Sequence, residues 1–130
     1  MCAAIVNTDP FNMSAGIGKW ASFSCNILCS HNELITWFVN GSPLPSIETA
    51  GFMFQTNPPH SYCSTLNTFD STLSLKIEHP LDFPVTVHCA IVSVCDLNSN
   101  CTATTCFSED AYLEGKAIHR TKLYFLMHHL

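Results

Sequence analysis

Hydrophobic and polar positions alternate with a period of two along three separate stretches of the chain. In residues 21–29 the odd positions hold Ala, Phe, Cys, Ile and Cys, whereas positions 22, 24 and 26 hold Ser, Ser and Asn. Residues 73–78 and 85–91 repeat this pattern, with apolar residues and cysteine on one parity. Every second side chain lies on the same face of an extended strand, so these stretches predict half-buried strands. Their predicted core residues are Phe23, Leu73, Leu75, Ile77 and Val87.

A fourth stretch, residues 34–39, is largely apolar on both faces. This is typical of a central strand that is covered on both sides. Trp37 has the parity of Ile35 and Val39, so we expect its ring at the centre of the core.

Turn and proline signals divide the remainder of the chain. Asn40-Gly41 predicts a tight turn after the central strand, and Pro43 and Pro45 keep the next residues out of a sheet interior. Residues 51–56 predict a short strand, whereas residues 62–70 fit either a strand or an open connection. Before residue 110 we expect no helix longer than one turn, with a single turn allowed near residues 79–83.

These pieces together resemble a known family. Cys25, Trp37 in the run WFVNGSPLP, the L-x-L-x-I strand and Cys89 resemble the B, C, E and F strands of an immunoglobulin-like domain. The resemblance covers roughly residues 14–107, and the second cysteine of CNILC is similar to variable-type domains of immune-type receptors. It implies an all-β, two-sheet antiparallel Greek-key sandwich, with Cys25 and Cys89 joined by an inter-sheet disulfide against Trp37.

The resemblance also has consequences for single positions. Residues 51–56 would be strand C′, beside strand C. A tyrosine is usual two residues before the second cysteine of this family, and here that position is Val87. Asp82 is the nearest acidic residue, one position out of the usual register.

Composition narrows the possible functions. The chain has 130 residues, the length of one domain, and its charged content of 12% is about half the usual share. The net charge is −5, and Lys76 is the only basic residue between Trp20 and Ala111. Nucleic-acid binding needs clustered lysines and arginines, so we expect no nucleic-acid partner.

Eight cysteines are a high count for a cytosolic chain. They suit an oxidising compartment, where disulfides persist, and we therefore expect an extracellular location, at the cell surface or secreted. The alternative is a zinc site, although neither group of cysteines has the tight C-x2-C spacing of a zinc knuckle. We predict no metal and no cofactor. The two groups weighed for zinc are Cys25, Cys29 and His31, and Cys95, Cys101 and Cys106.

The sequence does not decide how the other cysteines pair. In the resembled fold, strands B and F run toward the same end of the sandwich, so Cys29 and Cys95 would finish near each other. This pair is the favoured second disulfide, and a hairpin bond between Cys95 and Cys106 is nearly as plausible. Cys63 would then pair with Cys101 or Cys2.

We expect the sandwich to occupy residues 14–110. Residues 1–13 would be an N-terminal extension, and residues 111–130 a C-terminal tail that is loosely ordered or a short helix. The first ten residues lack the basic region and the long apolar run of a secretory signal. The apolar end of the tail is too short for a bilayer, which takes about 20 residues, so an anchor of the parent protein would lie outside this segment.

The motifs favour a glycoprotein rather than an enzyme. Three N-x-S/T sequons, at Asn12, Asn40 and Asn100, fall in predicted loops or edges, where glycans can be attached. The sequence has no G-x-S-x-G, no H-E-x-x-H and no phosphate-binding glycine loop, and its seven histidines are scattered. We expect neither catalysis nor a small-molecule substrate.

One predicted surface is unusually apolar. The outward positions of strands C, F and G include Leu34, Phe38, His88 and Val92, and exposed apolar patches often mark contact sites. An equal alternative is that the tail or residues 51–56 cover Phe38 and Leu34. Members of the resembled family bind proteins through this face or through the nearby loops, here 31–33 and 96–100. The resemblance thus implies partner contacts at Phe38, His31, Asn32, Asp96 and Asn98.

The sequence therefore predicts an extracellular binding module of a cell-surface receptor or adhesion protein, which recognises a protein ligand or counter-receptor. Two alternatives stay open. One is a secreted decoy with the same fold, and the other is a small cysteine-rich metal-binding protein.

Overall fold

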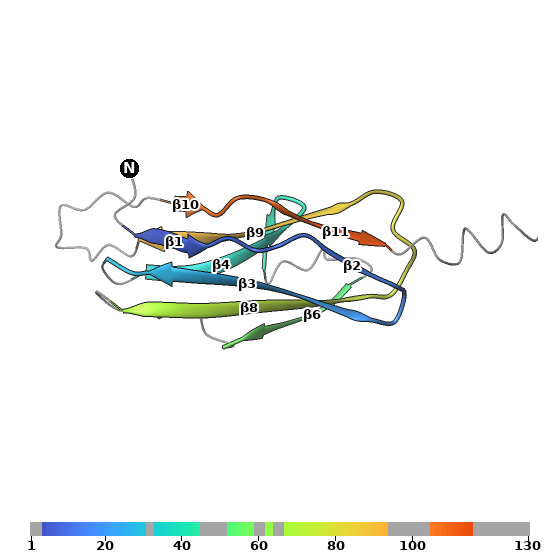
Figure 1. Ribbon diagram of the computed structural model, residues 1–130, viewed down its shortest axis with the longest axis horizontal. Helices are drawn as coiled ribbons and strands as arrows, with labels where there is room; N and C mark the ends of the chain where they lie inside the picture. Colours follow the sequence, from blue (N-terminus) through green and yellow to red (C-terminus); the bar gives the residue numbers. More distant parts are fainter. Residues whose placement is uncertain are drawn as a thin grey trace, which may run out of the picture.

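The computed structural model describes residues 4–30, 33–44, 52–58, 62–63, 67–93 and 105–115. Within these ranges the chain forms eleven strands and no helix. The strands lie in two layers that face each other (Figure 1). In the ranges described, no helix has the length and apolar character that crossing a membrane requires. The architecture is the all-β sandwich that the alternating pattern predicts.

The smaller sheet has four strands. Its long central pair runs antiparallel in unbroken register from Trp20↔Lys76 to Leu28↔Thr68, as two strictly alternating sequences allow. A shorter strand lies on each side of this pair. In order, the strands are β1 (Ile5–Thr8), β3 (Trp20–Leu28), β8 (Thr68–Ile77) and β6 (Phe52–Asn57).

The larger sheet has seven strands. Its main path is β2 (Met13–Ala15), β11 (Ala111–Gly115), β9 (Val85–Ser93), β4 (Glu33–Val39) and β5 (Ser42–Pro43). Two short strands pair beside this path, β10 (Thr105–Phe107) with β9 and β7 (Tyr62–Cys63) with β4. The described pairs are antiparallel except β2 with β11, which is parallel.

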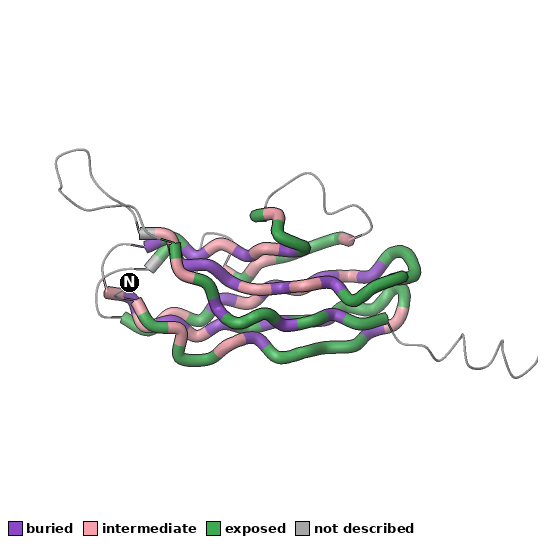
Figure 2. The backbone as a smooth tube through the Cα atoms, turned by 90° about the horizontal axis from the view of Figure 1, so that it is seen from above, coloured by how far each residue is buried: buried purple, intermediate pink, exposed green. Residues whose placement is uncertain are grey.

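The core lies between the layers and follows the predicted parity. Buried and exposed residues alternate along the long strands, as the tube in Figure 2 shows. The six residues assigned to the core from the sequence are all at most 2% exposed: Phe23, Trp37, Leu73, Leu75, Ile77 and Val87.

Two bridges join the layers at the centre of this core. Cys25 and Cys89 form a disulfide, and Trp37 Nε1 donates a hydrogen bond to Ser71 Oγ at 2.9 Å. Cys25 pairs in register with Ser71 on the smaller sheet, and Trp37 pairs with Cys89 on the larger one. The four residues thus form a closed rectangle, with two strand pairings as one set of sides and two bridges as the other.

Residues 52–57 form a strand, but its partner corrects our expectation. β6 pairs with β8 in the smaller sheet, from Phe52↔Ile77 to Asn57↔Thr72, and does not lie beside β4 as a C′ strand. A short apolar segment can pair with either sheet edge, because its own pattern does not encode the partner. The positions beside β4 belong to β5 and to the two residues of β7.

The sandwich also extends beyond residues 14–110, which corrects both expected boundaries. β1 pairs with β3 from Ile5↔Leu28, so part of the expected N-terminal extension is a strand. β11 lies within the expected tail, and Ala111 and Leu113 are fully buried in the core. Only two inward positions alternate there, which is too short a period to recognise. Residues 116–130 lie outside the described part of the chain.

Residues 78–84 form an irregular connection without the helical turn allowed near 79–83. Pro84 contributes to this, because the residue before a proline, here Phe83, is biased away from the helical conformation.

Candidate functional site

The outer face of the larger sheet carries a group of apolar and aromatic side chains. On β4 and β9 the odd positions face the core, so the even positions point outward. Cross-strand partners share a face, which places Tyr62 and Leu34 together and Phe38 beside His88. We call this surface the aromatic face and define it by its residues: Leu34, Phe38, Tyr62, His88, Phe107 and Tyr112.

Several of these side chains are open to solvent. Leu34 is 43% exposed, Tyr62 48% and Phe107 55%. The alternative in which residues 51–56 cover Phe38 and Leu34 is wrong for the described residues 52–56, because β6 pairs into the other sheet. Whether residues 116–130 cover this face lies outside the described structure.

Three rings at the centre of the face fix one another. Phe38 and His88 stack, with ring centroids 5.1 Å apart and planes inclined by 13°. Phe107 meets both rings edge to face, at 5.6 Å from Phe38 and 5.2 Å from His88. Such offset and edge-on arrangements are the ones that aromatic quadrupoles favour. The cluster holds Phe107 in place although more than half of its surface is exposed.

A β-bulge follows Phe107. The chain takes four residue steps from Phe107 to Ala111, whereas β9 takes three between their partners, Ala90 and Val87. The extra residue breaks the alternation, so the consecutive residues Glu109 and Asp110 are both exposed. Bulges of this kind re-aim side chains near functional sites.

Ser108 fastens the bulge to β9. Its backbone N–H donates to the Cys89 carbonyl at 2.8 Å, and its Oγ accepts from the Cys89 N–H at 2.9 Å. The Glu109 N–H donates to Asp9 Oδ1 at 2.9 Å, which ties the bulge to the segment after β1 as well. The backbone that presents Asp110 is therefore held on two sides.

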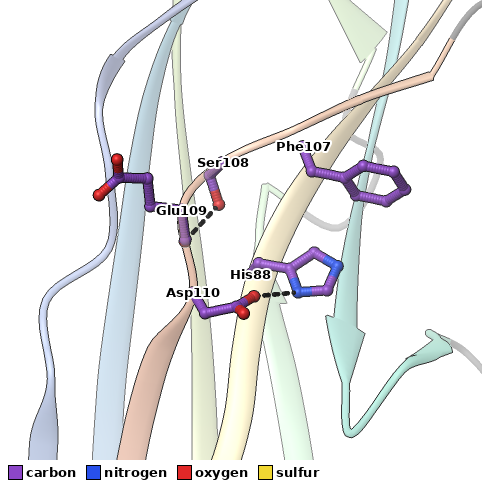
Figure 3. Close-up of a pocket in the computed structure, with 5 residues that line it drawn as sticks. All are labelled: His88, Phe107, Ser108, Glu109 and Asp110. Atoms are coloured by element: carbon purple, nitrogen blue, oxygen red, sulfur yellow. Dashed lines mark hydrogen bonds and ion pairs between the residues drawn. The ribbon is translucent and has the colours of Figure 1, made fainter.

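The bulge and the ring cluster enclose an open pocket of about 480 Å³, lined by His88, Phe107, Ser108, Glu109 and Asp110 (Figure 3). Asp110 Oδ1 lies 3.0 Å from His88 Nδ1, close enough for an ion pair when the imidazole is protonated. This nitrogen is buried and makes no hydrogen bond in the described structure, so the charge contact is its one polar interaction there. The Asp110 side chain is 50% exposed, and the Glu109 side chain points away from His88.

At the other end of β4, Glu33 is buried rather than presented to a partner. It is 1% exposed, and its carboxylate accepts hydrogen bonds from the N–H and the hydroxyl of Ser30. The expectation that the whole loop 31–33 reaches a partner is therefore wrong at Glu33. The other loop residues expected to contact a partner, His31, Asn32, Asp96 and Asn98, lie outside the described residues.

Two sequon asparagines are anchored by their side-chain oxygens. Asn12 Oδ1 accepts from the Tyr112 N–H at 3.0 Å, and Asn40 Oδ1 accepts from the Thr86 N–H at 3.1 Å. Asn40 and Gly41 have φ values of 51° and 81°, which is the two-residue turn expected between β4 and β5. Each oxygen is thus engaged while the residue as a whole stays exposed. Glycosylation stays a prediction, and Asn100 is outside the described part.

The disulfides are likewise only partly covered by the described residues. Cys29 and Cys106 are each disulfide-bonded, and no cysteine in the described ranges is free. Both candidate partnerships involve Cys95, which is not described, so the pairing stays a prediction. Among the described residues, no group of three or more His, Cys, Asp or Glu side chains could hold a metal ion.

Sequence reasoning named Phe38 and His88 but missed Phe107 and Asp110. A bulge shifts the parity within the segment 105–115, so no single alternating pattern runs through it. Ser71 was also missed, although its parity with Leu73 is a signal that could have found it.

Comparisons by sequence find no relative. No model of a known protein family matches the chain, and no curated protein matches it either.

Comparison with solved structures shows the fold. The N-terminal Ig1-2 module of the Drosophila receptor protein tyrosine phosphatase DLAR is similar over 87% of this chain and 48% of its own, with 18% identity and a TM-score of 0.54. Dpr1 IG1 bound to DIP-eta IG1 matches over 87% and 95%, with 13% identity and a TM-score of 0.54. The titin domains Z1Z2 in complex with telethonin match over 87% and 47%, with 12% identity and a TM-score of 0.55. The chain thus spans about half the length of the DLAR and titin structures.

Proposed function

From the premise that the chain has an immunoglobulin-like fold, we propose that it is an extracellular module of a cell-surface receptor or adhesion protein, which binds another protein through the aromatic face. The observation that carries this proposal is the contrast between the face and its surroundings. A soluble sheet that meets only water normally presents polar side chains outward. Here the outward side chains of the larger sheet include Leu34, Tyr62, Phe107 and Tyr112, which are all exposed.

The chemistry of the face favours a protein partner. Protein interfaces are enriched in Tyr, Phe and Trp and depleted in charge at their centre. Phe107 and Tyr62 provide exposed aromatic area of this kind, and the ring cluster fixes the position of Phe107 in advance. Prior ordering lowers the entropic cost of binding.

Two of the similar structures are complexes. Dpr1 IG1 is bound to DIP-eta IG1, and titin Z1Z2 is in complex with telethonin. They support the use of this fold for protein recognition, although neither identifies a partner for this chain.

The cysteines support the extracellular part of the proposal. Cys25 and Cys89 are bonded across the core, and Cys29 and Cys106 are bonded as well. Several structural disulfides in one domain are usual in oxidising compartments and rare in the cytosol.

The test compares two matched surface substitutions. Leu34→Asp changes the aromatic face, and Met53→Asp changes β6 on the other sheet, at a similarly exposed apolar position. Secreted multimeric fusions of the wild type and both variants would be screened against an array of extracellular domains. We expect the wild type and Met53→Asp to bind the same partner, and Leu34→Asp to lose roughly tenfold or more in affinity.

Circular dichroism and intact mass would establish that both variants fold and oxidise like the wild type. Phe107→Asp serves as the second face variant if Leu34→Asp does not fold. Equal binding by the face variants and the wild type would contradict the proposal, and so would the absence of any bound partner for the wild type.

A further inference from the structure

We propose that the pocket beside His88 receives an arginine side chain of the protein that binds the aromatic face, an inference that rests on the proposed function. Its basis is the combination of an exposed aromatic ring, a half-exposed carboxylate and, among the described residues, the absence of a lysine or arginine on this face.

The ring supplies the first element. A cation is attracted to the face of an aromatic ring within about 6 Å of its centroid, and arginine stacks there more often than lysine. Phe107 lines the pocket and is the most exposed of the three rings, while its contacts with Phe38 and His88 fix its orientation.

Asp110 supplies the second element. A carboxylate has two oxygens with about four acceptor sites. His88 Nδ1 approaches Oδ1, and no other polar contact of the Asp110 side chain occurs within the described structure. Oδ2 is therefore open to a further donor, on the side chain that projects into the same pocket as Phe107 (Figure 3).

The lysines of the described ranges do not lie on the sheet that carries Asp110. Lys19 and Lys76 are the only basic residues in the described ranges. Lys76 lies on β8 in register with Trp20, and the Lys19 carbonyl accepts from the Ile77 N–H, so both belong to the smaller sheet. No lysine or arginine of the described larger sheet can neutralise Asp110.

The guanidinium of arginine fits these elements better than an ammonium. Its planar group can stack on Phe107 while its edge donates to Asp110, whereas lysine offers a strongly hydrated point charge. The inferred partner therefore presents an arginine beside apolar side chains.

The test uses small probes, so it does not require the partner. N-acetyl-arginine amide would be titrated into the full chain, with the His88 and Phe107 ring resonances followed by NMR. N-acetyl-citrulline amide is the neutral isostere, and N-acetyl-lysine amide tests the preference for a planar group. We expect saturable shifts with arginine, and affinity about fivefold or more lower for citrulline and for Asp110→Asn.

Two further variants separate pocket effects from structural ones. Phe107→Leu removes the ring but leaves Asp110 unchanged, and should also weaken arginine binding. Glu109→Gln removes the adjacent carboxylate, whose side chain points away from His88, and should change affinity by less than about twofold.

Equal binding of arginine and citrulline would overturn the inference, as would an unchanged affinity in Asp110→Asn, or shifts centred on other residues. Equal binding of lysine would overturn the preference for a guanidinium. Failure of these probes would leave the array result with Leu34→Asp unaffected, so the two proposals can fail separately.

Discussion

The outer faces of the two sheets differ in the residues that occupy their outward positions, although the strands of both sheets alternate in the same way. On the smaller sheet the outward positions 22–26 of β3 and 70–74 of β8 hold Ser, Thr, Asn and Asp, and cross-strand partners bond to one another, while Trp20 and Met53 are exposed apolar residues of the same sheet. Ser22 Oγ lies 2.9 Å from Ser74 Oγ, and Ser24 Oγ lies 3.2 Å from Thr72 Oγ1. Asn26 continues this ladder, donating to Asp70 and accepting from Asn7.

On the larger sheet the outward positions include Leu34, Tyr62, Phe107 and Tyr112, which leave apolar surface open, as well as Thr36 and Thr86. The ladder satisfies its own polar groups, so it gains little from a partner. The aromatic face exposes apolar area, and a partner that covered it would gain about 25 cal/mol for each Å² removed from water. The two sheets share one fold, so it is the pattern of outward residues that distinguishes the polar ladder from the face for which we propose a partner.

Truncating the central side chain of the shared core should have the largest effect on the stability of the domain. Trp37→Ala leaves a cavity between the sheets and removes the bridge to Ser71, so we expect a loss of about 3–5 kcal/mol in the free energy of unfolding. Trp20→Ala is the matched control, because Trp20 is 47% exposed, and it should cost less than about 1 kcal/mol. Urea unfolding followed by circular dichroism measures both, and similar costs would contradict the central role of Trp37.

Two serines on β8 compare the inner and the outer side of one strand. Ser71→Ala leaves the buried Trp37 N–H without its acceptor, which should cost about 1–3 kcal/mol. Ser74→Ala removes a contact on the solvated ladder, and water replaces the lost partner, so we expect less than about 0.5 kcal/mol. Equal midpoints for the two variants in urea would show that the inter-sheet hydrogen bond is not important for stability.

The aromatic face itself should contribute less to stability than the core does. Phe107→Ser removes an exposed ring and its edge-on contacts, and should cost less than about 1.5 kcal/mol. The same variant should no longer bind the partner found for the wild type, since a serine cannot replace the aromatic area that Phe107 would bury in the complex. A large loss of stability in thermal unfolding would instead make Phe107 a structural residue.

The alternation of the long strands predicted the core and the two layers, because each inward position is defined by its own neighbours in the sequence. The resemblance supplied the Cys25–Cys89 disulfide, which the structure contains, and the immunoglobulin-like fold, which the similarity to solved structures confirms. Local patterns were sufficient wherever a strand was long.

Features that depend on pairing were not predictable in this way. β6 pairs with β8, and β11 joins the core through its pairing with β9, in which Ala111 lies opposite Val87. The site was partly predictable for a similar reason. Phe38 and His88 lie on long strands with clear parity, whereas the position of Asp110 depends on a bulge that becomes visible only when two strands are aligned.

The rectangle at the core also provides an optical reporter. A disulfide quenches indole fluorescence by accepting an electron from the excited ring, and Trp37 is the direct cross-strand neighbour of Cys89. We therefore expect Trp20, which is partly in water, to dominate the emission of the oxidised protein. Reduction of the cystine raises the Trp37 signal, so the redox state of the domain can be followed by light without any label.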